Sequence, residues 1–204
     1  SVIDIGYNAF YNCTSLTNVE IGNDVVTIGD SAFKFCSKLT SVNTGDGVTT
    51  IGDSAFSWCS GLTSVEIGAS VTTIGEMIFS NCSSLESILV DAQNACYSSD
   101  AQGILYTKDM KKILIYPIMK ENENGKYAIP EGVERIGKCA FYKNEVLTEI
   151  TLPSTLKEIG DMAFFKCEKL SLVTLPDGLE KIGSDAFSYC QGMQPVMYIP
   201  DSVT

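Results

Sequence analysis

Few residues in this sequence have the types and spacing that catalytic chemistry requires. The chain contains no histidine, the usual base for activating a serine or cysteine nucleophile and the commonest metal ligand near neutral pH. Serine and cysteine hydrolase triads and histidine-dependent zinc sites are therefore excluded. We predict no catalytic residue, no resident metal and no cofactor.

Paired carboxylates are the remaining catalytic possibility. Glu20 and Glu66 are expected on one exposed face of a sheet, and two such groups can hydrolyse glycosides when they flank the scissile bond. That face is open and wet, so nothing would make one carboxyl the acid and the other the base. We therefore predict that the protein is not an enzyme.

Eight cysteines are the other reactive groups. They contain no C-x-x-C pair, so a zinc site has little support. Six follow the repeat described below: Cys13, Cys36, Cys59, Cys82, Cys167 and Cys190. Adjacent strands lie about 4.8 Å apart, which disulfide geometry tolerates, but parallel side-chain directions argue against bridges. We predict buried free thiols in the repeat and leave Cys96 and Cys139 undecided.

Composition limits the classes of partner. A chain of 204 residues with 45% hydrophobic residues can bury a continuous core. The net charge is -11, and the 14 Lys and Arg residues form no run, so neither nucleic acid nor an anionic membrane surface is expected as a partner.

No stretch approaches the roughly 18 apolar residues of a membrane helix. The start at Ser1 lacks the features of a signal peptide, so targeting segments of an exported protein would lie outside this chain.

An internal repeat of 23 residues organises the chain. Its pattern is I-G-x-x-A-F-x-x-C-x-x-L-x-x-V-x-I, followed by Gly or Pro and then by x-x-V-x-x. The Ile-Gly pair recurs at Ile5, Ile28, Ile51 and Ile74, and again at Ile136, Ile159 and Ile182. Between Ile74 and Ile136 the interval is 62 residues. One insertion therefore interrupts an otherwise regular array.

Each repeat is predicted to form one coil of a solenoid. The L-x-x-V-x-I segment alternates as a short strand does, and strands of successive coils should stack in parallel. The predicted strands are Val19–Ile21, Val42–Thr44, Val65–Ile67, Ile88–Val90, Tyr127–Ile129, Ile150–Leu152, Val173–Leu175 and Met197–Ile199. The A-F segment is predicted as a capped helical turn, with Asp or Ser accepting from its free amides. Its phenylalanines, such as Phe56, should fill one column of the core, and the repeated glycine indicates positive φ or close approach between coils.

The fold class expected is an α/β repeat solenoid: a right-handed coil with a parallel sheet on one face, short helical turns on the other and an inserted β-hairpin. We predict one solenoid domain over residues 1–204, with repeats in 1–90 and 128–204 and a hairpin-containing insertion at 91–127. The hairpin should join 103–107 to 113–117 through the polar tip 108–112. Because neither terminus resembles a capping unit, the chain is expected to be part of a longer array.

The repeat resembles the BspA-type leucine-rich repeat of surface-exposed proteins of bacteria and some parasitic protists. The segment I-G-D-S-A-F-x-x-C-x-x-L-T-S-V at Ile28 to Val42, repeated at Ile51 to Val65, carries the likeness, which covers nearly the whole chain. The resemblance implies an extracellular or cell-surface coil used for adhesion or ligand binding. It transfers no catalytic or binding residue.

Two functions follow from this interpretation. The first is a displayed module that binds host or matrix protein or glycan. Its candidate contacts are the outward strand positions Thr17, Asn18, Glu20, Thr40, Ser41, Asn43, Thr63, Ser64 and Glu66, or the basic hairpin tip with Lys108, Lys111 and Lys112, which could steer an acidic ligand. The alternative is a structural spacer that presents another domain at the cell surface, since recurring Thr and Ser also suit a merely soluble sheet.

Overall fold

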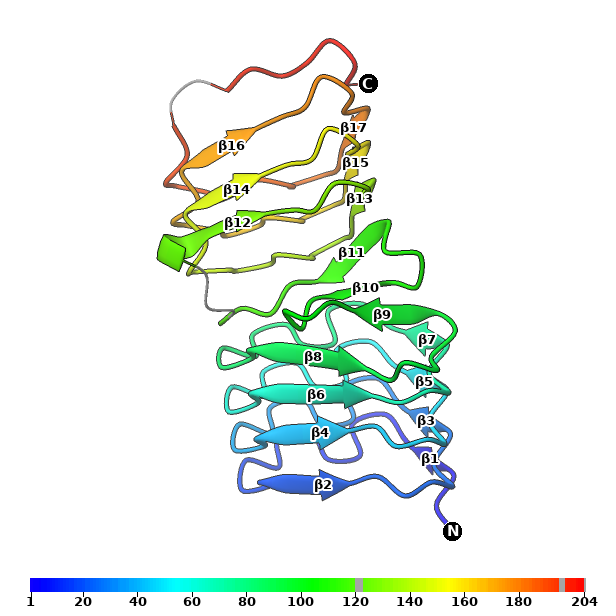
Figure 1. Ribbon diagram of the computed structural model, residues 1–204. Helices are drawn as coiled ribbons and strands as arrows, with labels where there is room; N and C mark the ends of the chain where they lie inside the picture. Colours follow the sequence, from blue (N-terminus) through cyan, green and yellow to red (C-terminus); the bar gives the residue numbers. More distant parts are fainter. Residues whose placement is uncertain (120–122, 195–196, 204) are drawn as a thin grey trace. The chain divides into compact units, whose positions relative to one another are not determined.

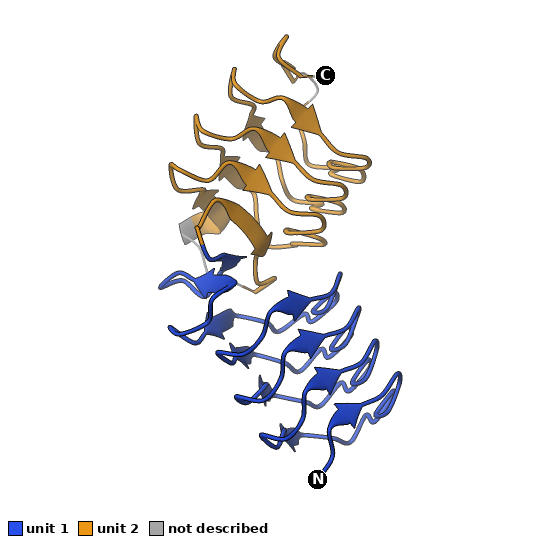
Figure 2. Cartoon of the chain, turned by 90° about the vertical axis from the view of Figure 1, so that its right-hand side faces the viewer, with its two compact units in different colours: residues 1–108 blue, residues 109–204 orange. Residues whose placement is uncertain are grey.

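The structure is a computed structural model that describes residues 1–119, 123–194 and 197–203. Two compact units are distinguished, residues 1–108 and residues 109–204 (Figure 2). Each is a stack of coils in which strands of successive coils run side by side (Figure 1).

Unit 1 contains two parallel sheets whose strands advance by one repeat per coil. The first sheet has the order β2 (Asn18–Glu20), β4 (Ser41–Asn43), β6 (Ser64–Ile67) and β8 (Ser87–Val90). The second has the order β1 (Asp4–Ile5), β3 (Thr27–Ile28), β5 (Thr50–Ile51) and β7 (Thr73–Ile74). Register is strict: Val42 pairs with Val19 on one side and Val65 on the other.

Unit 2 repeats this arrangement. One parallel set consists of β11 (Lys112–Ile115), β13 (Arg135–Ile136), β15 (Glu158–Ile159) and β17 (Lys181–Ile182). The other has the order β12 (Lys126–Ala128), β14 (Glu149–Thr151) and β16 (Leu172–Thr174). A three-residue 3-10 turn, η1 (Glu123–Gly125), precedes β12.

The predicted parallel coil is confirmed, with two differences in its strands. Seven predicted strands are present, each beginning one residue earlier than expected. The described residues 197–203 contain no strand, so the prediction for Met197–Ile199 is wrong. The second sheet was not predicted. Its strands are two-residue pieces just before each repeated glycine, too short for an alternation pattern to reveal them.

The predicted helical turns are also wrong, and backbone conformation explains why. In each A-F segment two residues four positions apart have positive φ, as at Ser31 (55°) and Phe35 (65°). Amides therefore alternate between a local bond, such as Ala32 N to Gly29 O at 3.2 Å, and a bond to the next coil, such as Phe33 N to Ala55 O at 2.8 Å. An α-helix needs consecutive bonds within one segment, whereas here half of the donors tie neighbouring coils together.

The carboxylates expected to cap those turns act between coils as well. Asp53 Oδ1 accepts from the backbone N–H of Glu76 in the next coil at 2.7 Å. Asp30 does the same for Asp53 at 2.8 Å, and Asp161 for Ser184 at 2.8 Å. These side chains stabilise the stack rather than a helix terminus.

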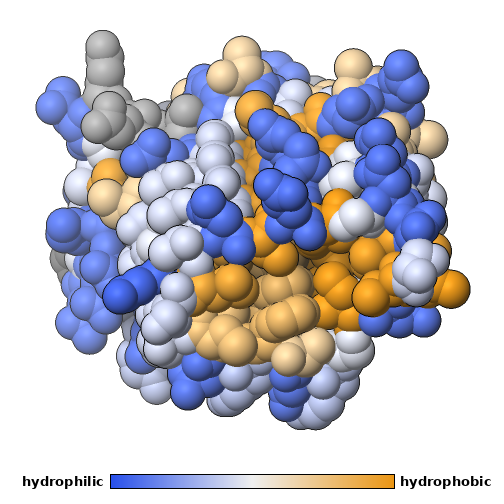
Figure 3. Space-filling model, turned by 90° about the horizontal axis from the view of Figure 1, so that it is seen from below, coloured by the Kyte–Doolittle hydropathy of each residue, from blue (hydrophilic) through white to orange (hydrophobic). Residues whose placement is uncertain are grey.

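Phenylalanine rings form the predicted core column. Phe33, Phe56, Phe141 and Phe164 are fully or almost fully buried, and neighbouring rings stack with centroids about 5 Å apart. In the first coil Phe10 stacks on Phe33 on one side only and is 41% exposed. The view along the stack from that coil shows the apolar core edge surrounded by polar side chains (Figure 3).

Close approach between coils, rather than positive φ, accounts for the repeated glycine. A Cβ at Gly52 would lie 2.8 Å from the carbonyl carbon of Gly29 in the preceding coil. Gly75 and Gly183 meet the preceding coil in the same way. None of these three has positive φ. Glycine here permits the coils to pack at their normal separation.

The repeat cysteines are free thiols, as predicted. Four are buried, and their Sγ atoms donate to the carbonyl of the phenylalanine 26 residues earlier, as Cys59 does to Phe33 O at 3.1 Å. Cys13, in the first coil, is exposed and Cys190 is half-buried. Cys96 and Cys139 are also free and half-buried.

The insertion begins with an antiparallel hairpin that the sequence analysis did not foresee. In unit 1, β10 (Leu105–Thr107) pairs with β9 (Tyr97–Ser99). The Tyr97 hydroxyl accepts from the N–H of Ile74 and donates to the carbonyl of Thr72, both at 3.2 Å, so β9 is tied to the strand β7. Within the described ranges, no helix has the length and apolar character needed to cross a membrane.

Candidate functional site

The outward face of the sheet β2-β4-β6-β8 is a largely polar surface that spans four coils of unit 1. Two columns of side chains cross it in register. Their members are Asn18, Ser41, Ser64 and Ser87 in one column and Glu20, Asn43, Glu66 and Leu89 in the other. Inward-facing Val42 and Val65 are buried, which fixes the direction of the outward residues.

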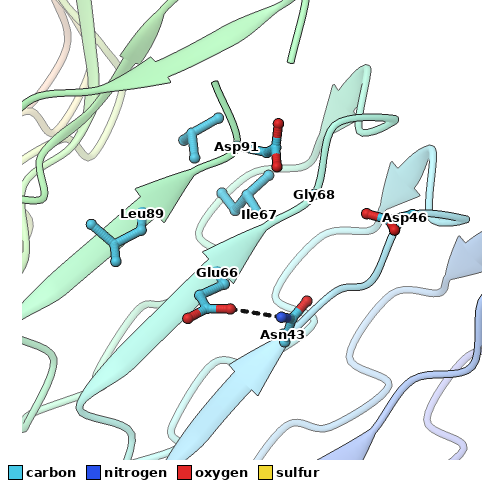
Figure 4. Close-up of a pocket in the computed structure, with 8 residues that line it drawn as sticks. Asn43, Asp46, Glu66, Ile67, Gly68, Leu89 and Asp91 are labelled. Atoms are coloured by element: carbon cyan, nitrogen blue, oxygen red, sulfur yellow. Dashed lines mark hydrogen bonds between the residues drawn. The ribbon is translucent and has the colours of Figure 1, made fainter. Parts of the chain in front are cut away.

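A shallow hollow lies at the carboxyl ends of three of these strands. Its volume is ≈ 220 Å³, and its lining includes Asp46, Glu66, Leu89 and Asp91. Glu66 and Leu89 rise from neighbouring strands, and Asp46 and Asp91 stand in the turns beyond the strand ends (Figure 4). Asn43 Nδ2 donates to Glu66 Oε2 at 2.6 Å, which holds that carboxylate at the border of the hollow.

The hollow combines an apolar patch with negative charge. Leu89 is 49% exposed although leucine usually occupies the interior, and the carboxylates of Asp46, Glu66 and Asp91 line the same hollow. Unit 1 as a whole has eleven Asp and Glu residues and only three basic ones, Lys34, Lys38 and Lys108. A partner with a basic and partly apolar contact surface fits this arrangement.

The predicted sheet contacts divide into two groups. Asn18, Glu20, Ser41, Asn43 and Glu66 are exposed, and Ser64 is half-buried. The threonines are exposed too, but two of their hydroxyls bond across coils: Thr40 Oγ1 donates to Thr17 O at 3.3 Å, and Thr63 Oγ1 donates to Thr40 O at 3.1 Å. The threonine column therefore stabilises the stack, whereas the Glu20 column carries the carboxylates of this face, with Glu66 held by Asn43.

Sequence reasoning missed Asp46, Leu89 and Asp91. Asp46 and Asp91 lie in turns whose course only the fold sets. Leu89 occupies the position of Glu20 and Glu66 in its repeat, so an aligned comparison of repeats contained a signal: one leucine where other coils carry polar residues.

The predicted carboxylate pair has no catalytic arrangement. Glu20 and Glu66 lie on the same face, separated by the strand of Asn43, and both project outward. The two carboxylates project in the same direction and do not face each other across a cleft. No group of three or more potential metal ligands is found among the described residues.

The lysines of the predicted hairpin tip fall on both sides of the boundary between the units, which lies between Lys108 and Asp109. Lys108 Nζ donates to Ala92 O at 3.2 Å within unit 1. Lys111 forms an ion pair with Glu134 at 2.6 Å within unit 2, and this hydrogen bond raises the pKa of Lys111. Lys112 is half-buried in β11. The tip as a basic binding site stays a prediction.

The corresponding face of unit 2 is different in its electrostatics. Lys126 of β12 and Glu149 of β14 form an ion pair at 2.6 Å across the sheet. Further inter-coil pairs join Lys157 to Glu180 at 3.4 Å and Lys181 to Glu158 at 3.0 Å. In unit 2, lysines therefore pair with carboxylates of neighbouring coils, whereas the hollow of unit 1 is lined by carboxylates.

Solved structures with a similar fold come from bacteria. A pneumococcal vaccine antigen, PcpA, has a TM-score of 0.68 and 24% identity over 88% of this chain and 50% of that one. A leucine rich cell surface protein from Faecalibacterium prausnitzii has a TM-score of 0.60 and 29% identity, covering 100% of this chain and 72% of that one. A leucine-rich repeat protein from Eubacterium ventriosum has a TM-score of 0.57 and 21% identity, covering 98% and 77%.

The chain spans half the length of the pneumococcal antigen. A search of curated protein sequences found no relative of this chain. The family model described as BspA type leucine rich repeat region matches residues 3–122 and 111–204, in 6 copies. With both the repeat and the coil established, the chain belongs to the BspA-type leucine-rich repeat family.

Proposed function

We propose that this chain is a cell-surface binding module that engages an extracellular protein with a basic contact surface through the outward face of β2-β4-β6-β8. The observation that carries the proposal is a hollow lined by the exposed Leu89 and by the carboxylates of Glu66, Asp46 and Asp91. Solenoids present such extended faces to partners. A location at the cell surface is supported by the F. prausnitzii protein, whose name describes it as a cell surface protein.

A binding role rather than an enzymatic one is supported by the flat arrangement of the carboxylates. Interactions at such a face depend on apolar anchors surrounded by complementary charge. Leu89 is the candidate anchor, and Glu66 supplies a charge whose position Asn43 fixes. Attraction between an acidic face and a basic partner also accelerates association.

The test is binding of the intact chain to a panel of extracellular matrix proteins and glycans by surface plasmon resonance. Glu66→Lys and Leu89→Lys should each weaken capture of the protein partner by roughly tenfold or more. Glu145→Lys is the matched control, because it makes the same charge change at an exposed turn residue away from the strands. Equal binding by the three variants would eliminate the sheet face as the contact surface.

A structural spacer is the second candidate, and the threonine column favours it. Hydroxyls of Thr40 and Thr63 bond to the preceding coil instead of pointing a donor at solvent. If the intact chain binds no member of the panel, the spacer becomes the better account of the fold.

A further inference from the structure

Each unit has a second ladder of aromatic rings that lies outside the core column. In unit 1 the rings are Tyr11, Phe35 and Trp58, with centroids 5.4 Å and 5.5 Å apart. In unit 2 they are Tyr142, Phe165 and Tyr189, with centroids 5.5 Å and 5.2 Å apart. Tyr11 is 46% exposed, Trp58 44% and Tyr189 60%. We call these the outer ladders.

Three of the six outer rings stand on strained backbone. Phe35, Trp58 and Tyr189 have φ values of 65°, 63° and 62°, a region that bulky side chains rarely adopt and that asparagine tolerates better. Asparagine does occupy this position in other coils, at Asn12 and Asn81, with φ of 61° and 60°.

The fold requires the conformation at these positions but not the ring. In this conformation the backbone N–H bonds to the next coil: Phe35 N donates to Ser57 O at 2.9 Å and Trp58 N donates to Ser80 O at 2.8 Å. Asn12 N makes the same bond to Lys34 O at 2.8 Å. The coil does not need a ring at these strained positions. We therefore interpret the ring as a surface that contacts a ligand.

Lysines accompany the rings in both units. Lys34 Nζ lies 5.6 Å from the Phe35 centroid and Lys143 Nζ 5.5 Å from that of Tyr142. Lys166 Nζ lies 5.9 Å from Phe165 and 5.3 Å from Tyr189. Ammonium groups therefore lie next to the outer ladders in a chain with net charge -11.

Stacking determines which part of each ring a ligand meets. The planes of Tyr142 and Phe165 differ by 4° and those of Phe35 and Trp58 by 26°, so these two pairs stack, whereas Tyr11 meets Phe35 at 77° and Tyr189 meets Phe165 at 69°. Within the stacked pairs the shared faces are covered and the edges stay accessible, and the edge is the positive part of an aromatic quadrupole. Positive edges and ammonium groups together attract anions.

The shape of the ladders selects among anionic partners. Each ladder has one ring per coil and extends over three coils, a narrow track that suits a linear polymer better than a globular protein, whose interface needs about 800 Å² on each partner. A peptide cannot bind here by adding a strand, because the backbone N–H groups of Phe35, Trp58 and Lys166 already donate to carbonyls of the next coil. A nucleic acid, whose binding depends on many phosphate contacts, is the alternative polyanion that the test includes.

We propose that the outer ladders bind a linear acidic polysaccharide, with ring edges and lysine ammonium groups contacting its carboxylate or sulfate groups along the stack of coils. This surface is separate from the sheet face of the proposed function, and either can fail alone.

The experiment measures binding of the intact chain to polygalacturonate, with dextran as the neutral polymer and polyglutamate and oligothymidylate as other polyanions. The double variant Trp58→Asn with Tyr189→Asn should raise the Kd for polygalacturonate roughly tenfold or more. Lys34→Met with Lys166→Met should do the same and reduce the salt dependence of binding. Tyr7→Asn is the matched control, since Tyr7 is 74% exposed and outside the ladders.

Thermal unfolding distinguishes contact from structure. Because asparagine relieves the strain, the Trp58→Asn and Tyr189→Asn variant should unfold at a temperature no lower than that of the parent chain. A lowered midpoint would mean that the rings serve to cover the core, and the proposal would be wrong. Equal affinity for dextran, polyglutamate or oligothymidylate would also overturn it. Leu89→Lys should leave polygalacturonate binding unchanged, which keeps this result independent of the sheet-face test.

Discussion

The ring of Phe56 lies parallel to that of Phe33, with planes 2° apart and centroids separated by 5.3 Å. On its other side Phe56 stacks on Phe79 at 5.8 Å. Each repeat thus contributes one ring that is enclosed by its neighbours, and a single coil could not bury it alone. Nearest-neighbour contacts of this kind are the main source of stability in a solenoid.

Phe56→Ala should lower the free energy of unfolding by about 3 to 5 kcal/mol, because a fully buried ring between two others leaves a cavity that the stack cannot close. Urea unfolding followed by circular dichroism measures the loss. Ser70→Ala, at an exposed position, is the control and should leave stability almost unchanged. A similar midpoint for both variants would contradict the core column.

Gly52→Ala should destabilise the protein by about 3 kcal/mol or more, since the added methyl would meet the backbone of Gly29, which cannot move without separating the coils. Gly6→Ala makes the same change in the first coil, where no atom lies within 4 Å of the added Cβ. Differential scanning calorimetry of the two variants compares them directly. Comparable melting temperatures would show that the glycine is not kept for close approach.

Asp53→Ala should cost about 1 kcal/mol, because the backbone N–H of Glu76 loses its acceptor. Asp53→Asn retains an oxygen at the same place and should lose less than the alanine variant. Chemical denaturation at neutral pH provides the comparison. Should asparagine prove as damaging as alanine, charge rather than the inter-coil hydrogen bond would be the important property.

Stability should decrease in alkaline solution because of the buried thiols. Burial raises the pKa of Cys82 from 9.0 to about 12, so folding favours the neutral thiol. Its contribution is complete below pH 9 and is lost as the pH rises toward 12, because the unfolded chain releases this proton more readily. Urea unfolding in the presence of a reductant, between pH 7 and pH 11, should show this decline.

Cys82→Ala should make that decline shallower by up to about 1.4 kcal/mol per pH unit. Cys13→Ala removes an exposed thiol and should leave the pH profile as it is. Parallel profiles for the parent chain and Cys82→Ala would refute the role of the buried thiol.

The candidate site was predictable only where it repeats. The 23-residue spacing places Glu20, Asn43 and Glu66 on one face, and register in the sheet confirms that placement. Asp91 joins them through the turn that ends β8, whose course only the folded chain shows, while the repeat alignment could have marked Leu89 as the leucine of an otherwise polar column. The repeat shows which side chains of neighbouring coils lie next to each other on the sheet, but it does not show where the turns place their side chains.

The sequence by itself determined the coil, its period and its core, because identical residues at a fixed interval can all be buried only by stacking. Phe33 and Phe56 follow directly from that condition. Tertiary structure decided how the turns are made: the A-F segment has helical propensity, but its amides gain more by bonding to the next coil, and positive φ at Ser31 and Phe35 is the result. The helical propensity of a short segment contributes less stability than a ladder of hydrogen bonds that every coil extends. The predicted helical turns therefore do not form.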